Sequence, residues 1–288
     1  MMKQNKSENR NLWLFFFIAF VFSWLFWIPK ALIAQGLLSA PSILVNFLNS
    51  PFNPAAFGPF VAAFYLTYRS SGKMGVIELL KRGIDFKFSK VWFIPILLLM
   101  PAVTGGALLI SKLLGGITPD LTVLYSPWLI VYWFFYMLFL GGPLQEEFGW
   151  RGYALDRLQL RHTAFTSSVI LGFMWAVWHF PLNFASGMGP QYSQALSLFI
   201  GSVITIILLS ILFTWIYNNT GRSIFATLLF HASLNLSTFK LFPVFESQST
   251  VPYYSLLIFI SVITILIIWG PKRMVRGRYV KTTSPNSG

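Results

Sequence analysis

A small set of polar side chains interrupts a sequence that is otherwise strongly apolar. A charged side chain at the centre of a membrane-spanning helix costs about 2.5–3.5 kcal/mol on insertion scales, so each exception is a functional candidate. A carboxylate and an imidazole can together orient and deprotonate water, and imidazole and amide groups can hold the oxyanion that forms. The set therefore fits hydrolysis of an amide bond by an activated water. Its members are Glu146, Glu147, Arg151, His179, His231 and Asn235.

The spacing of these residues predicts how they face. His231 and Asn235 are four residues apart, so on a helix they lie on one face. Glu147 and Arg151 have the same spacing, with the acid first, and are predicted to pair within their own helix. Glu146 is rotated by about 100° from its neighbour, which leaves its carboxylate free to face a cavity.

The depth of the candidates along their helices predicts that they share one layer. Glu146 lies 16 residues before His162, and His179 lies 17 residues after it (162 − 146 and 179 − 162). In a helical hairpin that turns near His162, both would lie about 24 Å from the turn, at 1.5 Å per residue. His231, eight residues into its apolar segment (231 − 223), would be about 12 Å deep by the same rise. The depths agree if the tip, residues 156–162, protrudes as a solvated turn by about 12 Å.

A kink is predicted directly before this layer. Gly141, Gly142 and Pro143 follow one another there. Proline removes a backbone hydrogen bond and glycines loosen the packing of a helix. Irregular backbone at membrane depth is tolerated where it lines protein or a wet cavity, which suits a site open to water.

The composition identifies the chain as a membrane protein. Of its 288 residues 56% are hydrophobic and 10% are charged, whereas soluble domains carry about 25% charged residues. A crossing helix needs roughly 20 residues. We predict an all-α polytopic membrane protein with about eight transmembrane helices and a cytosol-facing polar cavity. The predicted segments are Leu12–Ile28, Pro54–Tyr68, Val91–Ile110, Pro127–Gln145, Thr163–Phe184, Ala195–Tyr217, Ser223–Phe239 and Val251–Gly270.

The formal net charge of +13 indicates topology rather than nucleic-acid binding. If the eight segments alternate sides, only Lys30, Lys112 and Lys240 of the 21 Lys and Arg residues fall on one side. All the others, Arg151 included, would flank the opposite face. This asymmetry is the positive-inside pattern and predicts that both termini are cytosolic. We therefore expect a multi-pass protein of the plasma membrane whose partners include membrane lipids and exclude nucleic acid.

The residues alone leave metal-assisted and metal-free hydrolysis both open. The chain has no cysteine, which excludes disulfides and thiolate metal sites. Glu146, His179 and His231 would be an acceptable ligand set for a catalytic zinc. No HExxH motif is present, however, and these ligands would come from three separate helices.

Three segments carry a resemblance to a known family. EEFGWRGYAL (146–155) resembles an EExxxR motif, WAVWH (175–179) an aromatic-xxx-His motif, and HASLN (231–235) an HxxxN motif. In order and spacing they resemble the CAAX-protease and bacteriocin-processing (CPBP, Abi-type) family of intramembrane endopeptidases, which includes the type II CAAX prenyl endopeptidase. Trp175 stands where phenylalanine is common in that family, a departure that is conservative in character.

The resemblance covers roughly Pro127 to Phe239 and suggests a division of the chain. Residues 1–126 would form N-terminal transmembrane helices and a basic cytosolic loop. Residues 127–239 would form the catalytic core, and residues 240–288 the last transmembrane helix with a basic cytosolic tail.

The resemblance also implies roles for the candidate residues. It implies an eight-helix fold with a cytosol-facing cavity, in which Glu146 and His179 activate water. It assigns the oxyanion site to His231 and Asn235. Family members have been described both as metalloproteases and as metal-independent glutamate proteases. We expect no required cofactor, with zinc or another divalent metal on Glu146, His179 and His231 as the alternative. The residues implied to be supporting are Glu147 and Arg151.

We predict a peptide hydrolase, an intramembrane glutamate- or metallo-endopeptidase. Its substrate would be a membrane-anchored protein or peptide, prenylated or not, with cleavage near the C-terminus. Two other classes stay open: a proton-coupled transporter that uses Glu146 and the histidines as a relay, and a non-catalytic bacteriocin-immunity or membrane scaffold protein. The transporter predicts pH-dependent flux in proteoliposomes, and the non-catalytic protein predicts a phenotype that survives alanine at position 146.

Overall fold

The computed structural model describes residues 2–185 and 192–276, with side chains described for residues 11–185 and 199–276. Within these residues the chain is helical and has no β-strand, which confirms the all-α prediction. Two π-helical segments, Trp150–Leu155 and Ser237–Leu241, continue α6 and α10. The α-helices are α1 (Met2–Ala34), α2 (Ser42–Asn49), α3 (Gly58–Arg82), α4 (Phe93–Leu113), α5 (Pro127–Leu140), α6 (Pro143–Gly149), α7 (Asp156–Gln159), α8 (Ala164–Trp178), α9 (Tyr192–Asn219), α10 (Ile224–Leu236) and α11 (Val251–Trp269).

The chain is a multi-pass membrane protein. In the part of the chain that the structure describes, five helical segments are long and apolar enough to cross a membrane, and a sixth span is the bent pair of α5 and Pro143–Gln159. The two parts of that pair meet at an angle of 44°, which confirms the predicted kink. The five straight segments are Asn11–Ala34, Lys90–Leu113, Phe199–Asn219, Ile224–Glu246 and Val251–Trp269.

Two of the eight predicted segments are helical but do not qualify as spans by length and composition. The segment predicted at Thr163–Phe184 consists of α8, with 15 residues, and a 3-10 turn at Phe180–Phe184. Pro181 in that turn has no backbone N–H to donate, which favours an end of the α-helix there. The segment predicted at Pro54–Tyr68 also starts with a 3-10 turn and runs on as α3 into a polar stretch that ends at Arg82.

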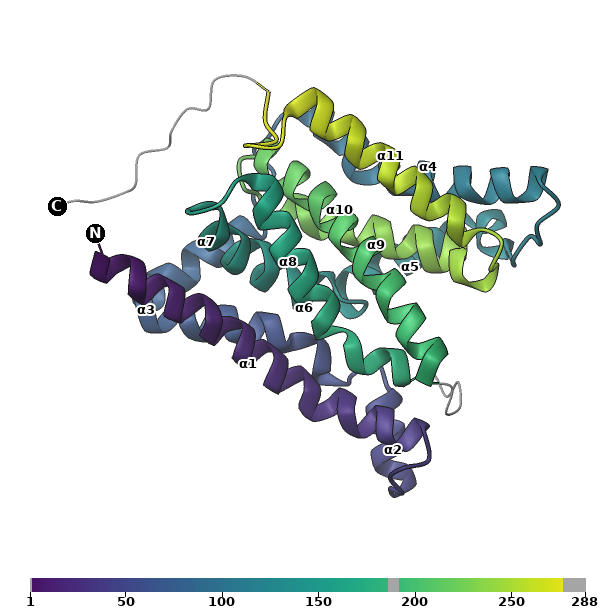
Figure 1. Cartoon of the computed structure of the whole chain (residues 1–288), viewed down its shortest axis with the longest axis horizontal. Helices are drawn as coiled ribbons and strands as arrows, with labels where there is room; N and C mark the ends of the chain where they lie inside the picture. The colour runs from purple at the N-terminus through teal and green to yellow at the C-terminus, as the bar shows by residue number, and fades with distance from the viewer. Residues whose placement is uncertain (1, 186–191, 277–288) are drawn as a thin grey trace.

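The helix that carries His231 and Asn235 lies at the centre of the bundle. α10 contacts α4, α5, α6 and α9, and it is the most buried of the straight spans (Figure 1). α1 packs along α3, and α8 packs along α9. In Figure 1 the start of α1, the short helix α7 and the end of α11 lie toward the same end of the molecule.

Glycines allow several of these helices to approach closely, as is common in membrane bundles. A Cβ atom at Gly149 of α6 would lie 2.5 Å from the carbonyl oxygen of Pro59 in α3. A Cβ atom at Gly172 of α8 would lie 2.7 Å from the Cα atom of Ile207 in α9. The helices around the polar residues are therefore packed backbone against backbone.

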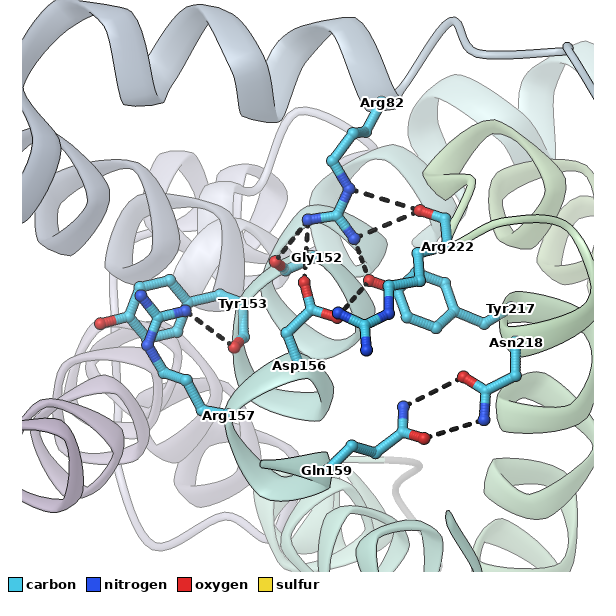
Figure 2. Close-up of polar contacts among 9 residues, drawn as sticks. All are labelled: Arg82, Gly152, Tyr153, Asp156, Arg157, Gln159, Tyr217, Asn218 and Arg222. Carbon is cyan, nitrogen blue, oxygen red and sulfur yellow. Dashed lines mark hydrogen bonds and ion pairs between the residues drawn. The ribbon is translucent and has the colours of Figure 1, made fainter. Parts of the chain in front are cut away.

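Polar contacts fasten α7 to α3 and α9 (Figure 2). Arg82 forms an ion pair with Asp156 (2.9 Å) and a hydrogen bond to the hydroxyl of Tyr217. Tyr217 in turn donates to Asp156 (2.8 Å). Gln159 and Asn218 exchange two amide hydrogen bonds of 3.1 and 2.8 Å. The expectation of a solvated tip is wrong for this part of the turn, because Asp156 is held between two helices.

Candidate active site

The break between α5 and α6 places the two glutamates inside the bundle. Gly142 has a φ of +114°, a conformation that favours glycine. Gln145 closes the break, because its side chain accepts from the Gly142 N–H (3.2 Å) and donates to the Phe139 carbonyl (2.7 Å). Both glutamates then lie on α6, buried where this helix meets α3 and α10.

Two indole groups hold the carboxylate of Glu146. Its Oε2 atom accepts hydrogen bonds from Nε1 of Trp150 (3.2 Å) and from Nε1 of Trp175 (2.7 Å). The residue is only 5% exposed. We predicted a Glu146 carboxylate without bound partners, and this is wrong for Oε2, which accepts both indole hydrogen bonds. Among the residues that the structure describes, none donates to the other oxygen, Oε1.

Glu147 joins an arginine and a histidine. Its Oε1 atom accepts from Nη1 of Arg151 (2.7 Å), as the spacing predicted, and also from Nδ1 of His231 (2.8 Å). The side chains of Glu147 and Arg151 are fully buried, and that of His231 is nearly so. The guanidinium carbon of Arg151 lies 3.8 Å from the ring centre of Phe213. The charge analysis placed Arg151 among residues that flank the membrane, which is wrong: it is the interior counter-ion of Glu147.

His179 follows the last residue of α8 and lies among aromatic rings. Its Nδ1 atom lies 3.0 Å from the backbone carbonyl of Trp175, so Nδ1 donates and Nε2 keeps its lone pair. The imidazole stacks on Trp27 of α1, with ring centres 5.9 Å apart and planes at 20°. A half-buried imidazole with one nitrogen fixed, and the other without a partner among the described residues, is suited to accept a proton from water.

Asn235 lies one helical turn beyond His231 on α10. Its Nδ2 atom donates to the carbonyl of Gly141 (2.7 Å), a carbonyl next to the break between α5 and α6. A Cβ atom at Gly142 would lie 2.7 Å from Oε1 of Glu146 and 3.8 Å from Nδ2 of Asn235. The amide and the unbound carboxylate oxygen therefore both border Gly142.

Trp175 connects the parts of the site that come from different helices. Its N–H binds Glu146, and its ring centre lies 5.9 Å from that of His179 and 5.6 Å from that of His231. An acid from α6 and imidazoles from the end of α8 and from α10 thus surround one indole. His162, the remaining histidine, is exposed and lies in the turn before α8.

Sequence reasoning missed the tryptophans that orient this set. Trp150 lies four residues after Glu146, a spacing that places both side chains on one helical face and could have indicated the contact. The contacts of Trp27 with His179 and of Trp175 with Glu146 gave no such signal, because these partners are far apart in the chain. The resemblance marked Trp175 as a conservative departure, yet an indole adds an N–H donor that a phenylalanine ring lacks.

The alternative zinc ligands each have one engaged atom. Glu146 is bound through Oε2, and His179 and His231 are bound through Nδ1. Among the described residues, no group of three or more His, Cys, Asp and Glu side chains is placed to hold a metal ion. The metal-free reaction stays a prediction.

A cavity of about 340 Å³ lies away from these residues, between the end of α1, α2 and Ala185. Lys30 and Leu48 are part of its lining. The polar cavity facing the cytosol that we expected beside the glutamates stays a prediction.

Comparisons with known proteins point to one family. Residues 127–237 match the family described as type II CAAX prenyl endopeptidase, Rce1-like. The chain is also 27% identical, over 242 residues, to CAAX prenyl protease 2 of Methanococcus maripaludis; the alignment covers 80% of this chain and 85% of the relative. All the candidate site residues, from Glu146 to Asn235, fall within the segment that matches the family.

Proposed function

Because residues 127–237 belong to the Rce1-like family of type II CAAX prenyl endopeptidases, we propose that this protein hydrolyses a peptide bond of a membrane-associated protein or peptide. The observation that carries the proposal is the convergence of Glu146, His179 and His231 around Trp175. Ionisable groups are costly inside an apolar bundle, so their convergence from three helices favours chemistry over packing.

In the proposed reaction, a water molecule bridges Oε1 of Glu146 and Nε2 of His179. The water oxygen attacks the carbonyl carbon of the scissile bond while one of its protons passes to the Glu146 carboxylate. The C–N bond then breaks, and the nitrogen of the leaving peptide takes that proton. The products are a new C-terminal acid and a free amine, and Glu146 is again a carboxylate.

His231 and Asn235 would stabilise the oxyanion that forms on the carbonyl oxygen. Nδ1 of His231 donates to Glu147, so Nε2 is the nitrogen left for the substrate, and it donates to the oxyanion with the ring as an imidazolium that carries a proton on both nitrogens. Asn235 uses one amide hydrogen on the Gly141 carbonyl and has a second one to donate. Removing one positioned donor of this kind typically lowers kcat by about 10²–10³.

The substrate we propose is anchored in the membrane and is cleaved near its C-terminus. The relative from Methanococcus maripaludis is named CAAX prenyl protease 2. The apolar outer surface of the spans also suits a substrate that is held in lipid: Trp13 and Phe17 of α1 are 67% and 65% exposed. A prenyl group on the substrate would add affinity through this surface without taking part in the chemistry.

The test uses the purified protein in detergent with fluorogenic CAAX-type peptides, one prenylated and one not. Glu146→Gln is expected to lower kcat by about 10²–10⁴, the usual contribution of a general base. His179→Ala is expected to lower kcat by about 100-fold, because the water loses one of the two groups that position it. His162→Ala removes the exposed histidine and is expected to keep the wild-type rate. Faster cleavage of the prenylated peptide would support a prenylated substrate.

Undiminished turnover by Glu146→Gln and His179→Ala would contradict the proposal. Flux of protons in proteoliposomes that is lost in the same variants would favour a transporter. A cellular phenotype that survives Glu146→Ala would favour an immunity or scaffold protein. For the metal-free reaction we expect activity to persist with strong chelators and elemental analysis to find no stoichiometric zinc.

A further inference from the structure

Two tryptophans bind one oxygen of Glu146, and no donor among the described residues binds the other. We propose that Trp150 and Trp175 are positioning residues that lock the carboxylate through Oε2, so that Oε1 alone is the oxygen that takes the proton from water. This inference rests on the proposed function and deepens it. It assigns a role to two side chains whose N–H groups come from α8 and from the first residue after α6.

The indole donors are suited to hold a carboxylate in one orientation. An indole Nε1–H only donates, so it cannot exchange roles with its acceptor. Trp150 is 0% exposed and Trp175 is 4% exposed. The ring of Trp150 packs edge-on against Phe15 at 5.6 Å, and that of Trp175 packs edge-on against Phe213, also at 5.6 Å. The packing around both rings favours the orientation in which their N–H groups point at Glu146.

The space on the other side of the carboxylate is kept open by a glycine. A Cβ atom at position 142 would lie 2.7 Å from Oε1, closer than van der Waals contact allows. After Glu146, the nearest side chain to that point among the described residues is Asn235, whose Nδ2 atom would lie 3.8 Å from the same Cβ. Oε1 therefore faces the part of the site where the oxyanion donor lies.

Fixing one oxygen matters because a carboxylate can otherwise rotate about its terminal torsion. Rotation would exchange the two oxygens and move the proton acceptor out of line with the water and the carbonyl. Misplacement of a catalytic group by about 1 Å can cost roughly 100-fold in rate. With two N–H groups on Oε2, the orientation is set before the substrate binds.

The kinetic test replaces each indole with a ring that lacks the N–H. Trp150→Phe and Trp175→Phe are each expected to lower kcat by about tenfold, and the double variant by about 100-fold, because geometry is lost while ring packing is largely kept. KM should change little, since neither indole is proposed to touch the substrate. The matched control is Trp215→Phe: Trp215 is 6% exposed, and its N–H has no hydrogen-bond partner among the described residues.

A second measurement does not depend on activity. The chain has 11 tryptophans, and 15N labelling of their indoles gives one N–H resonance for each. Trp150→Phe, Trp175→Phe and Trp215→Phe assign three of these resonances by deletion. Glu146→Gln removes the charge that the two indoles bind, so the resonances of Trp150 and Trp175 should move upfield while that of Trp215 stays in place.

The outcomes separate this inference from the proposed function. If Glu146→Gln abolishes cleavage but Trp150→Phe and Trp175→Phe keep the kcat of Trp215→Phe, the positioning role is overturned and the function stands. If the wild-type protein cleaves none of the peptides, the function fails, and the indole resonances still decide the inference. Resonances of Trp150 and Trp175 that do not move in Glu146→Gln would overturn it in either case.

Discussion

Two adjacent glutamates have different partners and therefore different consequences. Glu146 receives two neutral N–H donors and makes no ion pair among the residues described, whereas Glu147 receives Arg151 and His231. An arginine without exposed surface needs a counter-ion, because burying an unpaired charge is costly. Glu147 thus stabilises the bundle and orients an imidazole, and Glu146 is left for the reaction.

This difference predicts opposite outcomes for two conservative substitutions. Glu147→Gln leaves Arg151 as an uncompensated buried charge and is expected to lower the free energy of unfolding by about 3–5 kcal/mol. Glu146→Gln removes no ion pair and should unfold close to the wild-type temperature in detergent, although it is expected to be inactive. Thermal unfolding of both variants followed by tryptophan fluorescence checks this. Equal unfolding temperatures for the two variants would show that Glu147 is not the counter-ion.

At the scale of the elements, the site depends on close contact between α6 and its neighbours. Gly149 allows α6 to touch the backbone of α3, and the break at Gly141 and Gly142 turns α6 toward α10. At that break, Gln145 binds the backbone N–H of Gly142 and the carbonyl of Phe139, and Asn235 binds the carbonyl of Gly141. Asn235 therefore serves the architecture as well as the proposed chemistry.

The contact between α3 and α6 predicts an effect of a single methyl group. Gly149→Ala would place its Cβ 2.5 Å from Pro59, and overpacking of this kind typically costs about 1–3 kcal/mol. Gly201→Ala in α9 is the matched control, because a Cβ there meets nothing within 4 Å and alanine favours a helix by up to about 1 kcal/mol. The free energies of unfolding of the two variants should therefore change in opposite directions. A neutral Gly149→Ala would mean that α3 and α6 do not meet backbone against backbone.

The cluster in Figure 2 predicts that Asp156 fastens α7 and the π-helix before it. Asp156→Asn weakens the contacts to Arg82 and Tyr217, so backbone amides in residues 150–159 should exchange faster with deuterium. Asp120→Asn is the control, because among the described residues Asp120 binds only to Thr122, two residues away. Unchanged exchange in Asp156→Asn would indicate that α7 is held by apolar packing instead.

At the scale of the whole molecule, the charge distribution predicts an orientation in the membrane. The residues Lys30, Lys112 and Lys240 lie on the side we expect to face outward, and both termini on the cytosolic side. In the structure the start of α1 and the end of α11 lie toward the same end of the bundle, where α7 also lies (Figure 1). The orientation of that end stays a prediction.

Cysteine labelling tests this orientation directly, since the native chain has no cysteine. Leu114 follows α4 and is 69% exposed, and Leu160 follows α7 and is 63% exposed. A membrane-impermeant maleimide should label Leu114→Cys in intact cells and Leu160→Cys only after the cells are permeabilised. The reverse pattern, or labelling of both in intact cells, would contradict cytosolic termini.

The sequence by itself determined that the protein lies in a membrane, that its fold is all-α, and which residues are candidates for the site. Apolar composition required helices in lipid, and the cost of buried charge singled out Glu146, His179 and His231. Local spacing predicted the pair of Glu147 and Arg151 and the kink at Gly142, because both involve neighbours on one stretch of chain. Helix ends were predicted less well, since a run of apolar residues continues through 3-10 turns such as Phe180–Phe184.

Only the tertiary structure decided how these residues are paired. Glu147 and His231 are 84 residues apart, and Glu146 and Trp175 are 29 apart. Helical periodicity describes which residues share a face of one helix, but it carries no information about which faces of different helices meet. The indoles that hold Glu146, and the counter-ion role of Glu147, follow from how α6, α8 and α10 pack together.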